Sequence, residues 1–217
     1  GFVACELNLF ICTHPDNLEA IDLTGVRTLE NESFFGCVKL ANLGDTTSIE
    51  YIGYAVFSMG NTDRYGSLTK FEFGSKINTI GTEAFNRQSL TEVVIDNQST
   101  NLCIWEYAFS NCDILESVVL NVKDLTWDAD GYQFAYCDVL KSVEFQKSSE
   151  TTSIPQYFFD DCYKLEEVIL SNNMATIGRN SFSNCRSLKG VDIPNSGTLI
   201  DVHAFEYTEA LDFVNFG

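Results

Sequence analysis

Hydrophobic residues return along this chain at a nearly constant interval, and one phenylalanine marks each return. Eight phenylalanines follow one another at intervals of 23 to 28 residues. They are Phe34, Phe57, Phe85, Phe109, Phe134, Phe159, Phe182 and Phe205. A sequence period of roughly 20–50 residues is typical of repeat proteins, in which each unit stacks on the next. The pattern therefore predicts a solenoid.

Around each phenylalanine the apolar positions follow a common frame, I-x-x-x-[AS]-F-x-x-C-x-x-L-x-x-V-x-I. The segments that begin at Thr79, Cys103, Ile154 and Thr176 follow it most closely. The closing L-x-x-V-x-I alternates at its end, as a strand with one buried face does. In the preceding A-F-x-x-C-x-x-L, apolar residues three or four apart indicate one or two helical turns. Ser, Asn, Asp and Gly between these pieces indicate turns.

A single unit cannot bury both its strand and its helical turn, so neighbouring units must stack around a continuous core. Successive strands joined by crossovers form a parallel sheet. We expect an α/β repeat solenoid of eight to nine coils, with one parallel β-sheet face and short helical turns or short strands on the other side. A parallel β-helix is the alternative, and the helical turn argues against it. We expect one domain over 1–217, with a partial first coil at 1–27 and repeats over 28–217.

The fuller frame, I-G-x-x-A-F-x-x-C-x-x-L-x-x-V-x-I, resembles the BspA-like leucine-rich repeat of bacterial surface proteins and some parasitic protists. The resemblance runs from about Leu18 to Phe216. It implies a leucine-rich-repeat solenoid that acts as a non-catalytic protein-interaction module. The partner it implies is a host extracellular-matrix or cell-surface protein, and the location is extracellular or at the cell surface. A passive spacer that displays another domain is the alternative function.

A cysteine stands three residues after five of the eight phenylalanines. These residues are Cys37, Cys112, Cys137, Cys162 and Cys185. One repeat position in successive coils forms a column with neighbours about 4.8 Å apart and parallel side chains, whereas a disulfide needs Cβ atoms about 3.8 Å apart. We therefore expect buried free thiols that pack as small apolar groups. Cys5 and Cys12 lie outside this column, and whether they pair stays open.

The chain is strongly acidic, with 31 acidic and 13 basic residues and a formal charge of −18. Nucleic-acid binding depends on Lys and Arg that neutralise phosphates, so this balance argues against it. It also argues against anionic membrane surfaces. No run reaches the roughly 18 apolar residues of a membrane span, so we expect no membrane insertion. The charge either keeps the rod soluble or attracts a cationic partner or divalent ions.

The residues that carry chemistry do not gather into a recognisable site. The only histidines, His14 and His203, lie far apart in coil order, which argues against a Cys–His nucleophile. No closely spaced cysteine pairs suggest zinc. Asp128-Ala129-Asp130-Gly131 resembles the start of a calcium loop, but Val139 stands where an EF-hand needs its closing glutamate. We expect no enzyme activity, no cofactor and no metal site.

The outward positions of the strands are the candidate binding surface. They are the x of V-x-I and the residue two before it, and most of them are polar. Val94 and Val119 are expected to be neighbours in an apolar patch with an acidic rim. Such patches mark interaction sites, although β-branched residues also favour strands. The predicted partner-binding face comprises Glu92, Val94, Val119, Glu144, Glu167 and Ile169.

The last repeat ends in a strand pattern, Leu211-x-x-Val214-x-Phe216, that no polar capping unit follows. Because solenoids need capped ends for solubility, we expect this chain to be part of a longer protein. We expect the rod to be a monomer.

Overall fold

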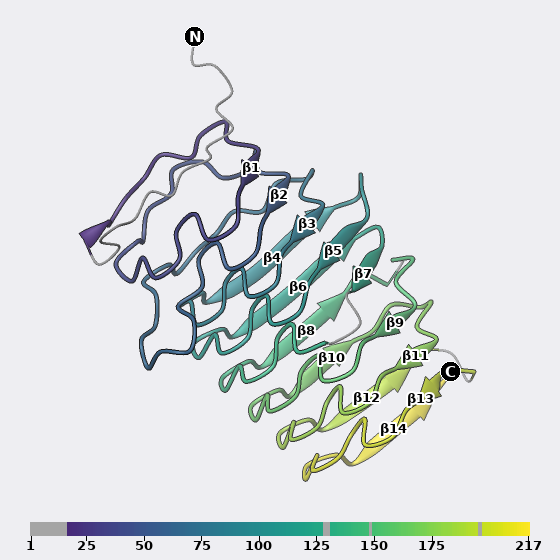
Figure 1. Cartoon of the computed structure of the whole chain (residues 1–217). Coiled ribbons are helices and arrows are strands. Elements are labelled where there is room, and N and C mark those ends of the chain that lie inside the picture. Colours follow the sequence, from purple (N-terminus) through teal and green to yellow (C-terminus); the bar gives the residue numbers. More distant parts are fainter. Residues whose placement is uncertain (1–16, 128–130, 148, 195–196) are drawn as a thin grey trace.

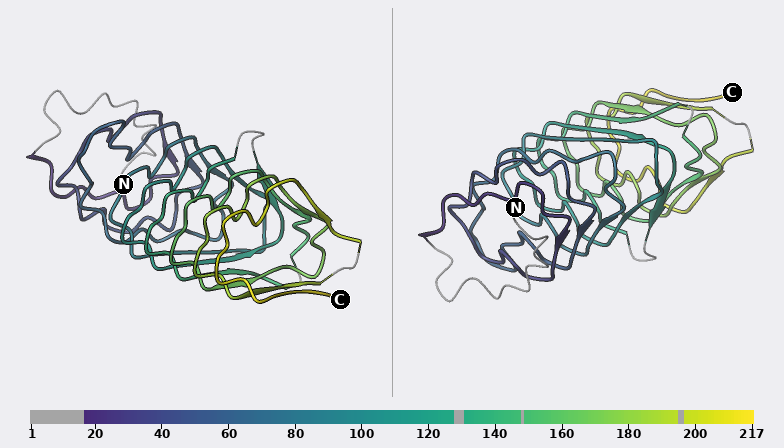
Figure 2. Two further views of the ribbon diagram at one scale, coloured as in Figure 1. Left: turned by 90° about the horizontal axis from the view of Figure 1, so that it is seen from below. Right: turned by 90° about the horizontal axis from the view of Figure 1, so that it is seen from above.

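The computed structural model describes residues 17–127, 131–147, 149–194 and 197–217. Over these residues the chain winds into a stack of coils whose strands lie on two opposite sides (Figure 1). Figure 2 shows the same stack from below and from above, with the coils following one another from the N-terminal to the C-terminal end. The predicted solenoid is confirmed.

One side of the stack carries short strands. β1 (Thr28–Leu29), β2 (Tyr51–Ile52), β3 (Thr79–Ile80), β5 (Leu102–Ile104) and β7 (Leu125–Trp127) form a five-stranded parallel sheet. β9 (Ser153–Ile154), β11 (Thr176–Ile177) and β13 (Leu199–Ile200) continue along this side as a three-stranded parallel sheet. One full turn of the solenoid runs from a strand on this side to the next strand on the same side, so eight strands enclose seven full turns. The described residues thus make about seven turns rather than the predicted eight to nine.

The opposite side carries longer strands. β4 (Glu92–Asn97), β6 (Ser117–Val122), β8 (Ser142–Phe145) and β10 (Glu167–Ile169) form a four-stranded sheet. β12 (Gly190–Ile193) and β14 (Phe213–Phe216) continue it as a pair. All the pairings are parallel. Side chains alternate between buried and less buried along β6, which is what the L-x-x-V-x-I pattern predicts. This side is the predicted parallel sheet.

The core is a stack of phenylalanine rings between the two sides. Each successive pair of the eight repeat phenylalanines is stacked, with ring centroids 4.9 to 5.8 Å apart. At mid-stack Phe109 lies 5.2 Å from Phe85 and 4.9 Å from Phe134, with rings tilted by only 2° and 5°. Such aromatic pairs contribute about 0.5–1.5 kcal/mol each beyond the area they bury. The period in the sequence is therefore the period of this core.

The predicted helical turns are wrong, because the A-F-x-x-C segments are built from tight turns. In the coil of Phe85 the amides alternate between two kinds of acceptor. Those of Glu83, Phe85 and Arg87 bond to carbonyls of the next coil, whereas those of Ala84, Asn86 and Gln88 bond back three residues. No α-helix forms anywhere in the described residues. The apolar spacing of three or four residues fits these turns equally well.

The turns depend on residues with a left-handed backbone. Fourteen non-glycine residues have positive φ, and every one lies two residues before or two residues after a repeat phenylalanine. They are Glu32, Ala55, Glu83, Arg87, Tyr107, Asn111, Tyr132, Tyr136, Tyr157, Asp161, Asn180, Asn184, His203 and Tyr207. Each such residue costs about 1–2 kcal/mol relative to the right-handed region. The inter-coil hydrogen bonds of these turns offset that cost.

The cysteine column faces inward, as predicted. Cys37, Cys112, Cys137, Cys162 and Cys185 are buried, and none of the five forms a disulfide. The last four each donate a sulfur hydrogen bond of 3.2 to 3.4 Å to the carbonyl of a repeat phenylalanine in the preceding coil. Burial raises the pKa of the Cys137, Cys162 and Cys185 thiols, which holds them in the protonated form that donates this bond. Cys5 and Cys12 lie outside the described residues.

Candidate interaction face

The strand register brings the predicted face residues into two neighbouring columns. Val94 lies directly opposite Val119, Val119 opposite Glu144, and Glu144 opposite Ile169. Glu92 and Glu167 stand two residues earlier on their strands, at the ends of a column that runs through Ser117 and Ser142. All six predicted residues therefore lie on one side of one sheet.

Within these columns the apolar surface is concentrated on β4 and β6. The Val94 side chain is 43% exposed, and Val119 is half-buried beside it. Glu144 lies between Val119 and Ile169, so Ile169 is separated from the valine pair. The exposed apolar unit of the face is therefore the pair Val94 and Val119.

Carboxylates surround this pair. Glu92, Glu144 and Glu167 are exposed, and within the described part of the chain none of the three has an ion-pair partner. The nearby lysines of β8 and β12 lie one residue before their strands and are already engaged. Lys141 pairs with Glu116 at 2.9 Å, and Lys189 pairs with Glu166 at 2.7 Å. The face consequently presents net negative charge around an apolar centre.

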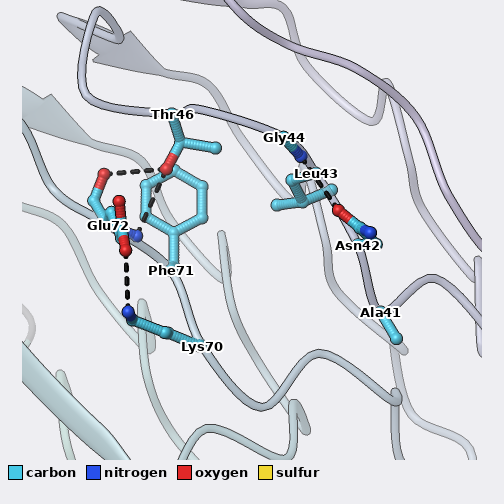
Figure 3. Close-up of a pocket in the computed structure, with 8 residues that line it drawn as sticks. All are labelled: Ala41, Asn42, Leu43, Gly44, Thr46, Lys70, Phe71 and Glu72. Carbon is cyan, nitrogen blue, oxygen red and sulfur yellow. Dashed lines mark hydrogen bonds and ion pairs between the residues drawn. The ribbon is translucent and has the colours of Figure 1, made fainter.

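β4 is the edge strand of the four-stranded sheet, on the side of the preceding coil. Lys70–Phe73 occupies the position of a strand, but it is extended without strand pairing to either neighbour. Toward the preceding coil, the Thr46 hydroxyl donates a hydrogen bond of 2.8 Å to the Glu72 carbonyl and accepts one of 3.2 Å from the Glu72 amide. Figure 3 shows this side-chain bridge beside the ion pair of Lys70 with Glu72. The Thr46 side chain thus supplies the hydrogen bonds that backbone pairing between strands would otherwise make.

Two clefts flank this unpaired segment. The first, of about 160 Å³, lies between Ala41–Thr46 and Lys70–Glu72 (Figure 3). The second, of about 210 Å³, lies between Lys70–Phe73 and β4, and Glu92 and Val94 form its far wall. The second cleft is therefore continuous with the predicted face.

Sequence reasoning placed residues on the face but did not find the clefts. Two signals pointed to them. The interval from Phe57 to Phe85 is the longest of the seven, and this coil carries Phe71 and Phe73 where β4 carries Val93 and Ile95. The larger rings pack in edge-to-face and tilted contacts with each other and with the phenylalanine stack. These ring contacts tie the unpaired segment to the phenylalanine core.

The described residues offer no alternative site for metal chemistry. Among them, no group of three or more His, Cys, Asp or Glu side chains is arranged to hold a metal ion. His203 contacts Glu206 at 3.3 Å. The acidic stretch Asp128–Asp130 lies outside the described residues. Within the same described ranges, no helix has the length and apolar character of a membrane span.

The fold defines the class of protein: a leucine-rich-repeat solenoid with parallel sheets. A model of the BspA type leucine-rich repeat region matches residues 8–126 and 78–212, in six copies. The chain belongs to this family of BspA-type leucine-rich repeat proteins. No curated protein matches the chain at a significant level.

Two solved structures of bacterial proteins share the fold, and a third matches more weakly. A leucine-rich repeat protein from Bacteroides ovatus is 23% identical with a TM-score of 0.67, and the match covers 91% of this chain and 54% of that protein. This chain thus spans about half the length of that relative. The leucine-rich repeat protein of T. pallidum, TpLRR, is 25% identical with a TM-score of 0.62, over 79% of this chain and 78% of that one. A leucine-rich cell surface protein from Faecalibacterium prausnitzii matches at 16% identity and a TM-score of 0.39, over 88% and 70%.

Proposed function

We propose that this chain is a non-catalytic protein-interaction module of a secreted or cell-surface protein, and that it adheres to host extracellular-matrix or cell-surface proteins. Membership of the BspA-type family supports the class of function. One observation supports the location of the contact surface: Val94 is 43% exposed and lies directly opposite Val119 inside a rim of unpaired glutamates. We assign the contact to Glu92, Val94, Val119, Glu144, Glu167 and Ile169.

The physical chemistry of this surface suits a protein partner. Protein interfaces combine an apolar centre with a polar rim, and a few central residues carry most of the binding energy. The valine pair supplies such a centre, at about 1 kcal/mol for each partly exposed valine that becomes buried. The surrounding carboxylates favour a partner with basic residues around its own apolar contact, and they increase its association rate.

Adhesion is tested by binding of the immobilised chain to a panel of extracellular-matrix proteins and to intact host cells. We expect saturable binding to at least one of them, weaker at high ionic strength because the carboxylates of the face are solvent-exposed. A folded chain that binds none of the matrix proteins and no host cell would contradict the proposal.

The alternative function is a passive spacer that holds another domain away from the cell envelope. The unbroken stack of coils supports it, since a rod of this kind sets a fixed distance between its ends. A spacer predicts that the chain binds no partner and that its face tolerates charge reversal. The same panel therefore separates the two functions.

A further inference from the structure

The cleft between Lys70–Phe73 and β4 has walls of two chemical kinds. Phe71, Phe73 and Val94 contribute apolar surface. Glu72 and Glu92 contribute carboxylates on opposite sides of the same space. With about 210 Å³ of volume, the cleft has room for one long side chain and none for a folded element.

The charges in this cleft do not cancel. Lys70 is its basic residue, and Lys70 already pairs with Glu72 at 2.7 Å. That pair raises the pKa of Lys70, so the lysine stays charged at neutral pH. Glu92 remains without an ion-pair partner among the residues that the structure describes. The cleft therefore has a net charge of about −1, with Lys70 in contact with Glu72 and acting on Glu92 only at longer range.

A guanidinium group fits these walls better than other cations do. It forms bidentate hydrogen bonds with a carboxylate, and its plane stacks on aromatic rings. Phe73 is only partly buried and lines the cleft, so a guanidinium group bound there lies beside it. The apolar stem of an arginine gains contact with Val94 while its head reaches Glu92.

We propose that this cleft is an anchor pocket for one arginine side chain of a protein partner. Glu92 binds the guanidinium, and Phe73 with Val94 packs against the stem. The pocket adjoins the valine pair, so an arginine next to an apolar residue in the partner engages both sites together. This assignment rests on the proposed interaction function and specifies the partner's chemistry.

The test uses a probe in place of the unidentified partner. The peptide acetyl-Val-Arg-Val-amide is titrated into the isotope-labelled chain, and amide shifts are followed by NMR. We expect shifts concentrated at Phe71, Phe73, Glu92 and Val94. The matched peptide acetyl-Val-Gln-Val-amide has a similar length without the charge, and we expect no saturable shifts from it.

Two substitutions in the cleft are expected to change the affinity for the arginine peptide in opposite directions. Glu92→Gln preserves shape and removes the carboxylate charge, so we expect about fivefold weaker binding of the arginine peptide. Lys70→Met frees Glu72 from its ion pair, so we expect binding about fivefold tighter. Glu209→Gln is the control, because Glu209 is an exposed glutamate that lies outside both the cleft and the proposed contact face. We expect it to leave binding unchanged.

Equal binding of the two peptides, shifts centred elsewhere on the molecule, or equal effects of Glu92→Gln and Glu209→Gln would overturn the arginine pocket. These outcomes differ from failure of the proposed function. If the chain binds a matrix protein but not the arginine peptide, the pocket assignment is wrong and adhesion stands. If the peptide binds at the cleft and no matrix protein or host cell binds, adhesion is wrong and the pocket stands.

Discussion

At the scale of single residues, the left-handed positions around each phenylalanine determine the shape of the coil. Ten of the fourteen donate a backbone hydrogen bond to the next coil, while neighbouring residues of the turn bond locally. The sequence does not reveal these positions, because tyrosine, glutamate, arginine and asparagine all occupy them. Only Asn111, Asp161, Asn180 and Asn184 carry a residue type whose short polar side chain tolerates such a conformation well. This is why the helical prediction failed at this segment.

Substitution of Asn184 tests the backbone account directly. Asn184 has φ of 58°. We expect Asn184→Ala to lower the free energy of unfolding by about 1 kcal/mol, because alanine pays the full cost of the left-handed region. We expect Asn184→Gly to be nearly neutral, since glycine adopts this conformation freely. Urea unfolding of the three proteins provides the measurement, and an alanine variant as stable as the glycine variant would contradict the account.

Asp160 gives the fold a pH dependence. Burial raises the pKa of this carboxyl from 3.8 to about 6, with a smaller contribution from Asp161 and an opposing hydrogen bond from Ser183. Between these two values the folded state binds more protons than the unfolded state. Stability supplied by Asp160 is therefore present at low pH and is lost as the pH rises toward 6 and above.

We expect Asp160→Asn to remove this dependence. The variant gains stability relative to the parent chain as the pH rises from 4 to 7, because an amide stays neutral throughout. Urea unfolding of both proteins across this range isolates the contribution of Asp160 from that of the other carboxyls. Parallel stability curves for the two proteins would show that this carboxyl does not titrate as described.

At the scale of elements, the sequence predicts the strands and the core well. The alternation in L-x-x-V-x-I fixes which residues of β4 and β6 face inward, and the register confirms that Val94 and Val119 are opposite each other. The second, short-stranded side was predicted only as an alternative to helical turns. Its strands are two or three residues long, which is too short for a periodic signal.

The phenylalanine stack predicts how stability is distributed along the rod. Phe109 is fully buried between two rings, whereas Phe205 is partly buried and stacks on Phe182 at 5.3 Å. We expect Phe109→Ala to cost about 3–5 kcal/mol of unfolding free energy. For Phe205→Ala we expect a smaller loss, of about 1–2 kcal/mol. The Phe205 ring is already partly exposed in the folded state, so its removal loses less buried apolar surface. Equal losses in denaturant unfolding would rule out a core organised around this stack.

At the scale of the whole molecule, charge and sheet continuity define where a partner can bind. The formal charge of −18 is compatible with solubility alone, but the free carboxylates gather around the valine pair and the adjoining cleft. The cleft lies in a coil that is longer than its neighbours and that carries Phe71 and Phe73 at the strand positions. A repeat frame describes what coils share, so it does not predict such a departure between coils. The variable positions of the repeat are therefore where function is to be sought.

The most direct measurement compares two double variants for binding to the partner captured by the immobilised chain. Val94→Lys with Val119→Lys places charge at the centre of the face. Ile114→Lys with Val202→Lys is the matched control, since these side chains are 45% and 51% exposed and lie outside the face. We expect Kd to rise at least about tenfold for the first variant and to stay unchanged for the second, with both folded by circular dichroism. Equal affinities of the two folded variants would contradict the assignment of the binding surface to this face.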